Sequence, residues 1–147
     1  MLKGLPKRRY MDGSVGDADK PVVLVVDDHD DTRQMSLIVL RSQGFDPVAA
    51  ESGEAAFARA CEAQPDVIVT DLAMPDGNGW DLLQRLSSDD RTSDIPVVML
   101  TACATDSVRQ RAREEGVDAF FFKPCAPNVL ADELRRLIDA RVKSSSV

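Results

Sequence analysis

The sequence has few of the side chains that usually bind transition metals. It contains one histidine, His29, and three cysteines, Cys61, Cys103 and Cys125, none of them in a CxxC pair. This set argues against a Cys/His or multi-histidine zinc site. An odd number of cysteines without such spacing is typical of reduced thiols, so we expect a cytoplasmic protein without structural disulfides.

Long apolar segments and an excess of positive charge are also missing. Val22–Val26 is among the longest apolar runs and has five residues, whereas a membrane-spanning helix needs about 20. Residues 1–9 are basic but lack the apolar stretch of a secretion signal. The formal net charge of −7 argues against direct binding of nucleic acid and against docking on an anionic membrane.

What is present suffices for one domain of ordinary size. Of the 147 residues, 44% are apolar, so the chain can fill a core, and wholesale disorder is excluded. Residues 1–20 carry glycine and mixed charge without apolar periodicity, which predicts a flexible N-terminal leader. We expect the folded domain over residues 21–143 and a disordered tail over residues 144–147.

Strand-like and helix-like segments alternate from Pro21 onward. Continuous apolar or β-branched runs predict strands buried on both faces, with one weaker strand after Gly44. The predicted strands are residues 22–26, 46–50, 67–70, 97–100 and 119–122, and the predicted helices are 31–43, 52–63, 80–86, 106–115 and 127–142. Helical spacing predicts a packed face on the first helix made of Met35, Ile38, Val39 and Ser42. This order predicts an α/β fold whose parallel sheet is covered on both faces.

Polar side chains follow four of the five predicted strands. Asp27 and Asp28 follow the first strand, Asp71 the third, Thr101 the fourth and Lys123 the fifth. In an open doubly wound sheet, ligands bind beyond the carboxyl ends of the strands, so these side chains are expected to converge. A single aspartate there would be interpreted as a helix cap, but three carboxylates repel one another unless a cation neutralises them.

The donor set favours a hard divalent ion with oxygen ligands. Mg²⁺ suits such a site because it needs few carboxylates, keeps waters and leaves room for phosphate oxygens. Aspartate, Mg²⁺, lysine and a hydroxyl are also the parts that hold a phosphoryl group during transfer.

Four short motifs at these positions are similar to those of a known family. Val25-Val-Asp-Asp28, Asp71-Leu-Ala-Met-Pro75, Thr101-Ala102 and Phe122-Lys-Pro124 resemble the signature set of response-regulator receiver domains, the phosphoacceptor modules of two-component signalling. The resemblance covers residues 21–143, and the chain is similar in scale to single-domain chemotaxis regulators. It implies a flavodoxin-like (βα)5 fold, with a five-stranded parallel sheet of order 2-1-3-4-5 and five helices.

The resemblance implies a phosphoacceptor and a metal site. Asp71 would be the phosphorylated aspartate, and Asp28 and Asp71 would bind Mg²⁺ directly. Asp27 would help to hold the ion through water, and the Ala73 carbonyl would be a further ligand. His29, beside the acid pair, is expected to be a solvated loop residue rather than a phosphohistidine.

The resemblance also implies a switch. Lys123 would pair with Asp71 at rest and with the phosphoryl group afterwards, and Thr101 would donate its hydroxyl to that group. Phe120 stands at the family's switch-aromatic position, where tyrosine would add a hydroxyl. The Lys123-Pro124 peptide bond is often cis in this family.

Two positions lead us to predict slow loss of the phosphoryl group. In receivers, the residues two beyond the phosphorylated aspartate and two beyond the threonine stand beside the approach of the hydrolytic water. Here they are Ala73 and Cys103. Alanine offers no hydrogen bond and a thiol is a weak donor. The chain is therefore not expected to be an enzyme beyond assisting its own phosphorylation and dephosphorylation.

The implied partners are proteins. They are a sensor histidine kinase or a histidine phosphotransferase, a downstream target, and a second copy bound through the face made by residues 106–115, 119–122 and 127–142.

With no output domain after residue 142, the chain is either a free-standing receiver or part of a longer protein. The alternative is a receiver-like binding module that works without phosphorylation. A haloacid-dehalogenase phosphatase fits less well, because Ala73 stands where a second aspartate is needed. A nucleotide-binding fold would need a glycine-rich turn after the first strand.

Overall fold

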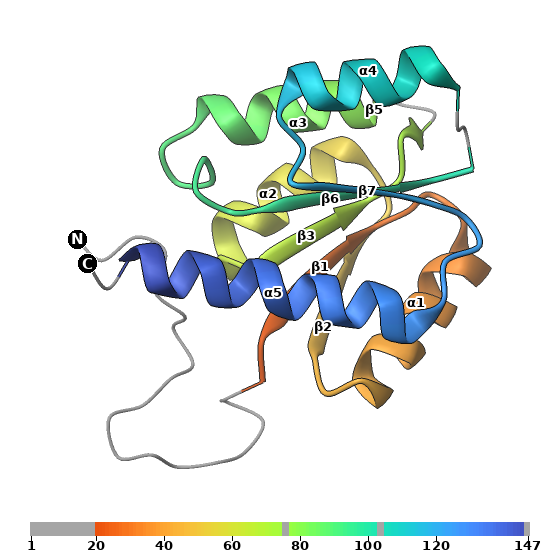
Figure 1. The fold of residues 1–147 in the computed structure, drawn as a ribbon, viewed down its shortest axis with the longest axis vertical. Helices are drawn as coiled ribbons and strands as arrows, with labels where there is room; N and C mark the ends of the chain where they lie inside the picture. Colours follow the sequence, from red (N-terminus) through yellow and green to blue (C-terminus); the bar gives the residue numbers. More distant parts are fainter. Residues whose placement is uncertain (1–19, 75–76, 103–104, 146–147) are drawn as a thin grey trace.

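The computed structural model describes residues 20–74, 77–102 and 105–145. Its main sheet consists of β1 (Val22–Val26), β2 (Asp46–Ala50), β3 (Val67–Thr70), β6 (Val97–Thr101) and β7 (Ala119–Phe122). All neighbouring strands of this sheet run parallel, in the order β2-β1-β3-β6-β7 (Figure 1). Numbered among themselves, these strands have the order 2-1-3-4-5, which confirms the predicted fold class.

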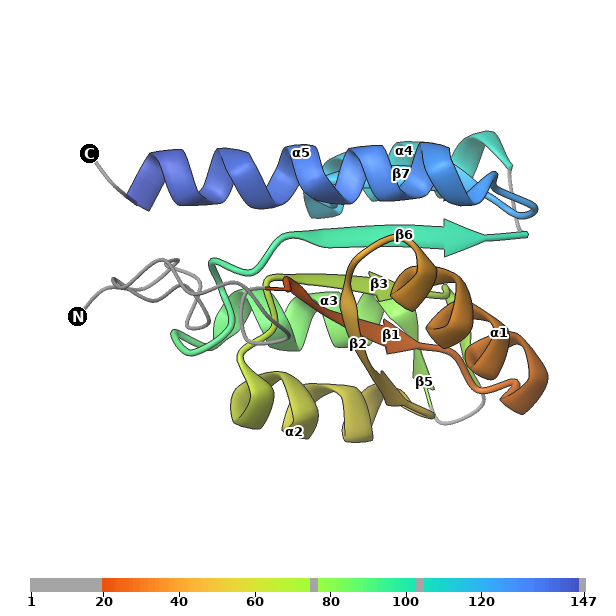
Figure 2. The ribbon, with the colours of Figure 1, turned by 90° about the horizontal axis from the view of Figure 1, so that it is seen from below.

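Five helices cover the two faces of this sheet. Helices α1 (Asp30–Ser42) and α5 (Pro127–Ser145) lie on one face. Helices α2 (Gly53–Ala63), α3 (Gly79–Ser88) and α4 (Asp106–Glu115) lie on the other. Figure 2 shows β6, β3 and β1 following one another between these layers. No helix in the described ranges has the length and apolar composition needed to cross a membrane.

The continuous apolar runs are explained by burial on both faces of the central strands. In β1, Val23 and Val25 pack under α1 and α5, whereas Leu24 and Val26 pack under the helices of the opposite face. Each of these four side chains is at most 4% exposed. Burying an aliphatic side chain of this size contributes about 1.5–3 kcal/mol. The central strand β1 is therefore held firmly from both sides.

The helices begin and end close to where the sequence signals predict. Ser52 caps α2 by accepting a hydrogen bond from the Ala55 N–H at 3.0 Å, and Thr105 caps α4 in the same way from Val108 at 3.2 Å. Gly116 ends α4 with a φ of 80°, a left-handed conformation that favours glycine. Ser52 and Thr105 thus mark where the loops that follow β2 and β6 end and the next helices begin.

The predicted packed face of α1 is wrong. Met35 and Ile38 are each 61% exposed, whereas Leu37 and Leu40 are the buried residues of this helix. The helix carries apolar side chains on two opposite faces, and periodicity alone does not say which of them contacts the sheet. Val39 is half-buried, and Ser42, exposed, donates its hydroxyl to the Val39 carbonyl.

Three further features differ from the sequence prediction. The side chains of β7 are all half-buried rather than buried, because β7 is an edge strand with one neighbour. Residues 73–74 (β4) and 77–78 (β5) form a short antiparallel pair that was not predicted. Helix α5 includes Ser144 and Ser145, which were predicted to belong to a disordered tail, because neither glycine nor proline follows Val142 to end it. The remainder of that tail and residues 1–19 of the leader lie outside the described residues.

Candidate functional site

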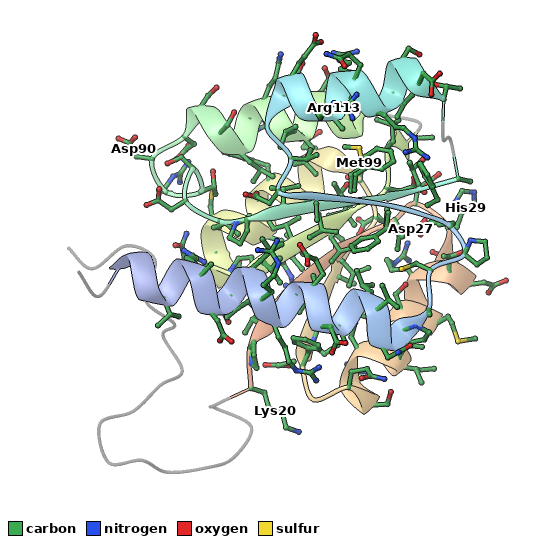
Figure 3. All side chains as sticks on the ribbon, viewed as in Figure 1. Lys20, Asp27, His29, Asp90, Met99 and Arg113 are labelled. Carbon is green, nitrogen blue, oxygen red and sulfur yellow. The ribbon has the colours of Figure 1, made fainter. Side chains whose placement is uncertain are left out.

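Backbone pairing carries the site residues just past the ends of the strands. Asp27, Asp71 and Lys123 directly follow β1, β3 and β7, and Thr101 is the last residue of β6. Each of the first three donates its backbone N–H to a carbonyl of the neighbouring strand, at 2.9–3.2 Å. The sheet therefore fixes the main chain at each of these positions. Figure 3 shows Asp27 and His29 at this edge, opposite Lys20, which precedes β1.

Lys123 joins two of the predicted acids. Its Nζ lies 3.1 Å from Asp71 Oδ2 and 3.3 Å from Asp27 Oδ2. Burial alone lowers the pKa of Lys123, but hydrogen bonding and attraction to Asp71, followed by the same contributions from Asp27, outweigh burial and raise that pKa. The ammonium group is thus charged at neutral pH and holds the two carboxylates together. The Lys123-Pro124 peptide bond is cis, as the sequence prediction suggested.

The second oxygen of Asp71 is held by the main chain. Asp71 Oδ1 accepts hydrogen bonds from the backbone N–H groups of Leu72 at 2.7 Å and Ala73 at 3.4 Å. Lys123 contacts the other oxygen, so the orientation of the carboxylate is set from two sides. The side chain of Asp71 is 11% exposed. It is therefore accessible to a reactant while remaining fixed in direction.

Gly79, the first residue of α3, allows this loop to close tightly. Its N–H donates to the Leu72 carbonyl at 2.7 Å. A Cβ at this position would lie 2.8 Å from the Asp71 carbonyl oxygen and 3.0 Å from Leu72 Cα. Both contacts are with backbone atoms that cannot rotate away. Any larger residue here must displace the main chain that carries Asp71.

The acidic residues form a group with the dimensions of a metal site. One potential ligand atom from each of Asp27, Asp28, His29 and Asp71 lies within 4.8 Å of the others. Within the described residues, Asp28 Oδ1 is buried without accepting a hydrogen bond, and a buried oxygen in that condition is costly unless a ligand satisfies it. Three carboxylates face the single ammonium group of Lys123, leaving two negative charges in excess. These oxygens and this charge fit a hard divalent cation.

His29 belongs to this group, which the sequence prediction did not anticipate. Its side chain is 69% exposed, in agreement with the expectation of a solvated loop residue. Its Nδ1 nevertheless lies 3.3 Å from Asp27 Oδ1 and 3.2 Å from Asp28 Oδ1. The His29 backbone N–H also donates to Asp27 Oδ1 at 2.9 Å. The sequence did contain a signal for this approach. An aspartate side chain commonly accepts a hydrogen bond from the backbone N–H two residues later, which places His29 beside Asp27.

A crevice of about 460 Å³ opens beside Asp71 and Lys123. One wall is formed by α1 residues Thr32, Met35 and Ser36, and the other by the segment that follows β7. Cys125 belongs to that second wall, and burial raises the pKa of its thiol. The thiol is thus protonated at neutral pH, so Cys125 lines the crevice rather than acting as a nucleophile.

The predicted switch residues lie on the two neighbouring strands β6 and β7. Thr101 is 1% exposed and pairs in register with Phe122. Phe120 is half-buried, and its ring meets that of Phe122 edge-on at a centroid distance of 5.3 Å. The Arg109 guanidinium of α4 lies 4.2 Å from the centroid of the Phe122 ring. A contact therefore connects α4 directly to the strand that ends at the site.

The two positions predicted to control hydrolysis are only partly described. Ala73 is exposed and carries no polar side-chain group. Cys103 lies outside the described residues. The structure thus brings together Asp27, Asp28, Asp71 and Lys123, with Thr101 on the adjoining strand end.

Known proteins resemble this chain in sequence. The profile of the response regulator receiver domain family matches residues 23–135. The chain is 37% identical over 116 residues to the phosphate regulon transcriptional regulatory protein PhoB of Escherichia coli, covering 79% of this chain and 51% of PhoB. It is 39% identical over 114 residues to the DNA-binding response regulator MtrA of Mycolicibacterium smegmatis, covering 77% of this chain and 48% of MtrA. The chain thus spans about half the length of these curated relatives.

Solved structures resemble the chain over most of its length. The chemotaxis protein CheY4 of Vibrio cholerae superposes with a TM-score of 0.75 at 30% identity, covering 80% of this chain and 98% of CheY4. A putative response regulator from Chloroflexus aurantiacus superposes with a TM-score of 0.77 at 29% identity, covering 82% and 99%.

Proposed function

Because this chain belongs to the response regulator receiver domain family, we propose that Asp71 accepts a phosphoryl group and thereby switches a protein-binding surface. The observation that carries this proposal is the contact of Lys123 with Asp71 at 3.1 Å, beside a group of further acids. An oriented carboxylate next to a fixed ammonium group and a potential cation site has the parts needed for phosphoryl transfer.

The reaction transfers a phosphoryl group from a histidine nitrogen of the donor to a carboxylate oxygen of Asp71. A carboxylate oxygen of Asp71 forms a bond to the phosphorus of a phosphohistidine, while the P–N bond breaks and its electron pair stays on the donor imidazole. Lys123 can follow the phosphoryl oxygens, since its Nζ already lies between Asp71 and Asp27. Thr101 would donate its hydroxyl to another of these oxygens. The chain assists this single event on itself and does not turn over a substrate.

Mg²⁺ is the cofactor that fits the acidic group. Asp28 and Asp71 would hold it directly, with Asp27 acting through water and the Ala73 carbonyl as a further ligand. When bound, the ion would supply positive charge that offsets the repulsion between the carboxylates and an approaching phosphoryl group. Asp28 Oδ1, which is buried and accepts no hydrogen bond, supports this arrangement.

Acetyl phosphate tests the proposal directly. Incubation with acetyl phosphate and Mg²⁺ should add the mass of one phosphoryl group to the intact chain, and a chelator should prevent this addition. The alternative function, a receiver-like module that binds partners without phosphorylation, would leave the mass unchanged under both conditions. That result would contradict the proposed function.

The phosphoryl donor is proposed to be a sensor histidine kinase or a histidine phosphotransferase. The crevice between α1 and the segment after β7 opens beside Asp71 and offers a phosphohistidine a route to it. Met35 lines that crevice, and together with Ile38 it exposes apolar surface on α1. A donor protein entering there would cover both side chains, and apolar contact would strengthen its binding.

Phosphorylation is expected to change the face formed by α4, β7 and α5. Movement of Thr101 towards the phosphoryl group would release space for Phe120 to turn, and the contact of Arg109 with Phe122 would transmit this change to α4. The same face is the proposed surface for a downstream protein or for a second copy of the chain. The coupling requires contacts that differ between the two states.

Thr101→Ala should separate phosphorylation from the switch. The chain has one tryptophan, Trp80, and the Arg111 guanidinium of α4 lies 4.8 Å from the centroid of its ring. Trp80 fluorescence should therefore change on phosphorylation of the native protein as α4 moves. In Thr101→Ala the phosphoryl group should be added but the fluorescence change should be mostly lost, because no hydroxyl draws residue 101 inward.

Thr101→Ser provides the matched variant, since it keeps the hydroxyl and should keep most of the fluorescence change. An equal change in native protein and Thr101→Ala, at equal phosphorylation by mass, would show that Thr101 does not drive the switch.

A further inference from the structure

The imidazole of His29 lies beside the carboxylates of the proposed metal site. Its Nδ1 lies 3.2 Å from Asp28 Oδ1, the buried oxygen that accepts no hydrogen bond, and 3.3 Å from Asp27 Oδ1. The backbone hydrogen bond from the His29 N–H to Asp27 Oδ1 fixes the start of the side chain. Nδ1 itself shares a hydrogen bond with Asp27 Oδ1, so the nitrogen lies beside the oxygens although the ring is 69% exposed.

These separations are those of neighbouring ligands on one ion. With metal–ligand bonds of about 2.1 Å, two ligands at right angles in an octahedral site lie about 3 Å apart. The 3.2 Å between His29 Nδ1 and Asp28 Oδ1, an oxygen of a proposed direct ligand, is close to this value. All four potential ligand atoms, including that of Asp71, fall within 4.8 Å of one another. Opposite ligands on such an ion lie about 4.2 Å apart, so a small contraction of the acidic group would let one ion contact the imidazole as well.

We propose that His29 is a side-chain ligand of this site and gives it a preference for transition metal ions such as Co²⁺ over Mg²⁺. Imidazole nitrogen suits divalent transition metals, whereas Mg²⁺ takes oxygen ligands and keeps its waters. A site of carboxylates alone would distinguish the two ions much less. The inference rests on the proposed function only in that both place a cation among Asp27, Asp28 and Asp71.

The consequence is a site with two modes of metal binding. Mg²⁺ would be held by the carboxylates with water in the position of the imidazole, and His29 would then remain outside. Co²⁺ would exchange that water for Nδ1. The exposed ring, at 69%, leaves room for both arrangements.

Calorimetric titration of the metal-free chain with CoCl₂ and MgCl₂ measures the preference. Because His29 is the only histidine of the chain, the protein must carry no histidine tag. We expect His29→Gln to weaken Co²⁺ binding by about tenfold or more and to change Mg²⁺ binding by less than about twofold. Asp31→Asn, which alters an exposed acid outside the metal-ligand group, should bind both ions like the native chain.

Proton NMR of the Co²⁺ complex identifies the ligand independently. A single histidine means that any imidazole signal shifted by the paramagnetic ion arises from His29, and such signals should be absent from His29→Gln. Unchanged Co²⁺ affinity in His29→Gln, or no shifted imidazole signal in the native complex, would overturn the proposal.

Asp28→Asn separates this inference from the proposed function. If this variant loses affinity for both ions while His29→Gln loses none, the carboxylate site stands and only the role of His29 is refuted. If Asp28→Asn binds Mg²⁺ as tightly as the native chain, the metal site of the proposed function fails, and the inference fails with it.

Discussion

Asp71→Ala should abolish phosphorylation of the chain by acetyl phosphate and Mg²⁺. Asp71 is the acid whose oxygens are oriented both by Lys123 and by backbone N–H groups, and it lines the crevice that we propose as the entrance for the donor. Asp27 is 5% exposed, and Lys123 and the His29 N–H already occupy its oxygens. The loss should therefore be complete in the mass spectrum of the intact protein, because no other carboxylate of the described site is both oriented by Lys123 and the main chain and open to the crevice.

Asp31→Asn is the matched control for this experiment. Asp31 lies in the first turn of α1, close to the site in sequence but exposed and outside the metal-ligand group. This variant should be phosphorylated to the same extent as the native chain. Full phosphorylation of Asp71→Ala at some other residue would show that the phosphoacceptor has been misidentified.

The phosphorylated chain should lose its phosphoryl group slowly, and Ala73→Asn combined with Cys103→Glu should accelerate this loss by about tenfold or more. Hydrolysis requires a water aligned with the bond between phosphorus and the Asp71 oxygen, and positioning is the main contribution that a protein can make. Ala73 is exposed and has no group that could hold such a water. Amide and carboxylate side chains at the two positions would supply hydrogen bonds that orient it.

The measurement is the decay of phosphorylated protein after removal of the phosphodonor, followed by mass at constant Mg²⁺ concentration. The single variants Ala73→Asn and Cys103→Glu should fall between the native chain and the double variant. If the native chain loses its phosphoryl group as fast as the double variant, backbone groups orient the water equally well and the argument from side chains is wrong. A slow native rate would suit a sustained signal or transfer of the phosphoryl group onward.

The fold and the position of the site could be predicted because both follow from strong local signals. Continuous apolar runs such as Val22–Val26 identify buried parallel strands, and the residues after those strands must meet at one edge of the sheet. The contact of Lys123 with Asp71 spans 52 positions in sequence. It was nevertheless expected, because both residues directly follow strands of the same sheet.

What could not be predicted depends on tertiary packing. Helix α1 carries apolar side chains on two opposite faces, so the burial of Leu37 in place of Met35 becomes visible only with the sheet present. The half-burial of β7 follows from its place at the sheet edge, which composition does not reveal. The approach of His29 to the acids depends on how the chain turns from β1 into α1.

The division of α1 into a packed and an exposed stripe separates stability from partner choice. Truncating Leu37 or Leu40 to alanine would cost about 2–5 kcal/mol of folding free energy, whereas exchanges at the exposed Met35 and Ile38 fall within about 0.5 kcal/mol. Substitutions on the exposed stripe can therefore accumulate without loss of folded protein. A duplicated copy of this chain could diverge towards a different phosphoryl donor while its sheet, its acids and Lys123 stay unchanged.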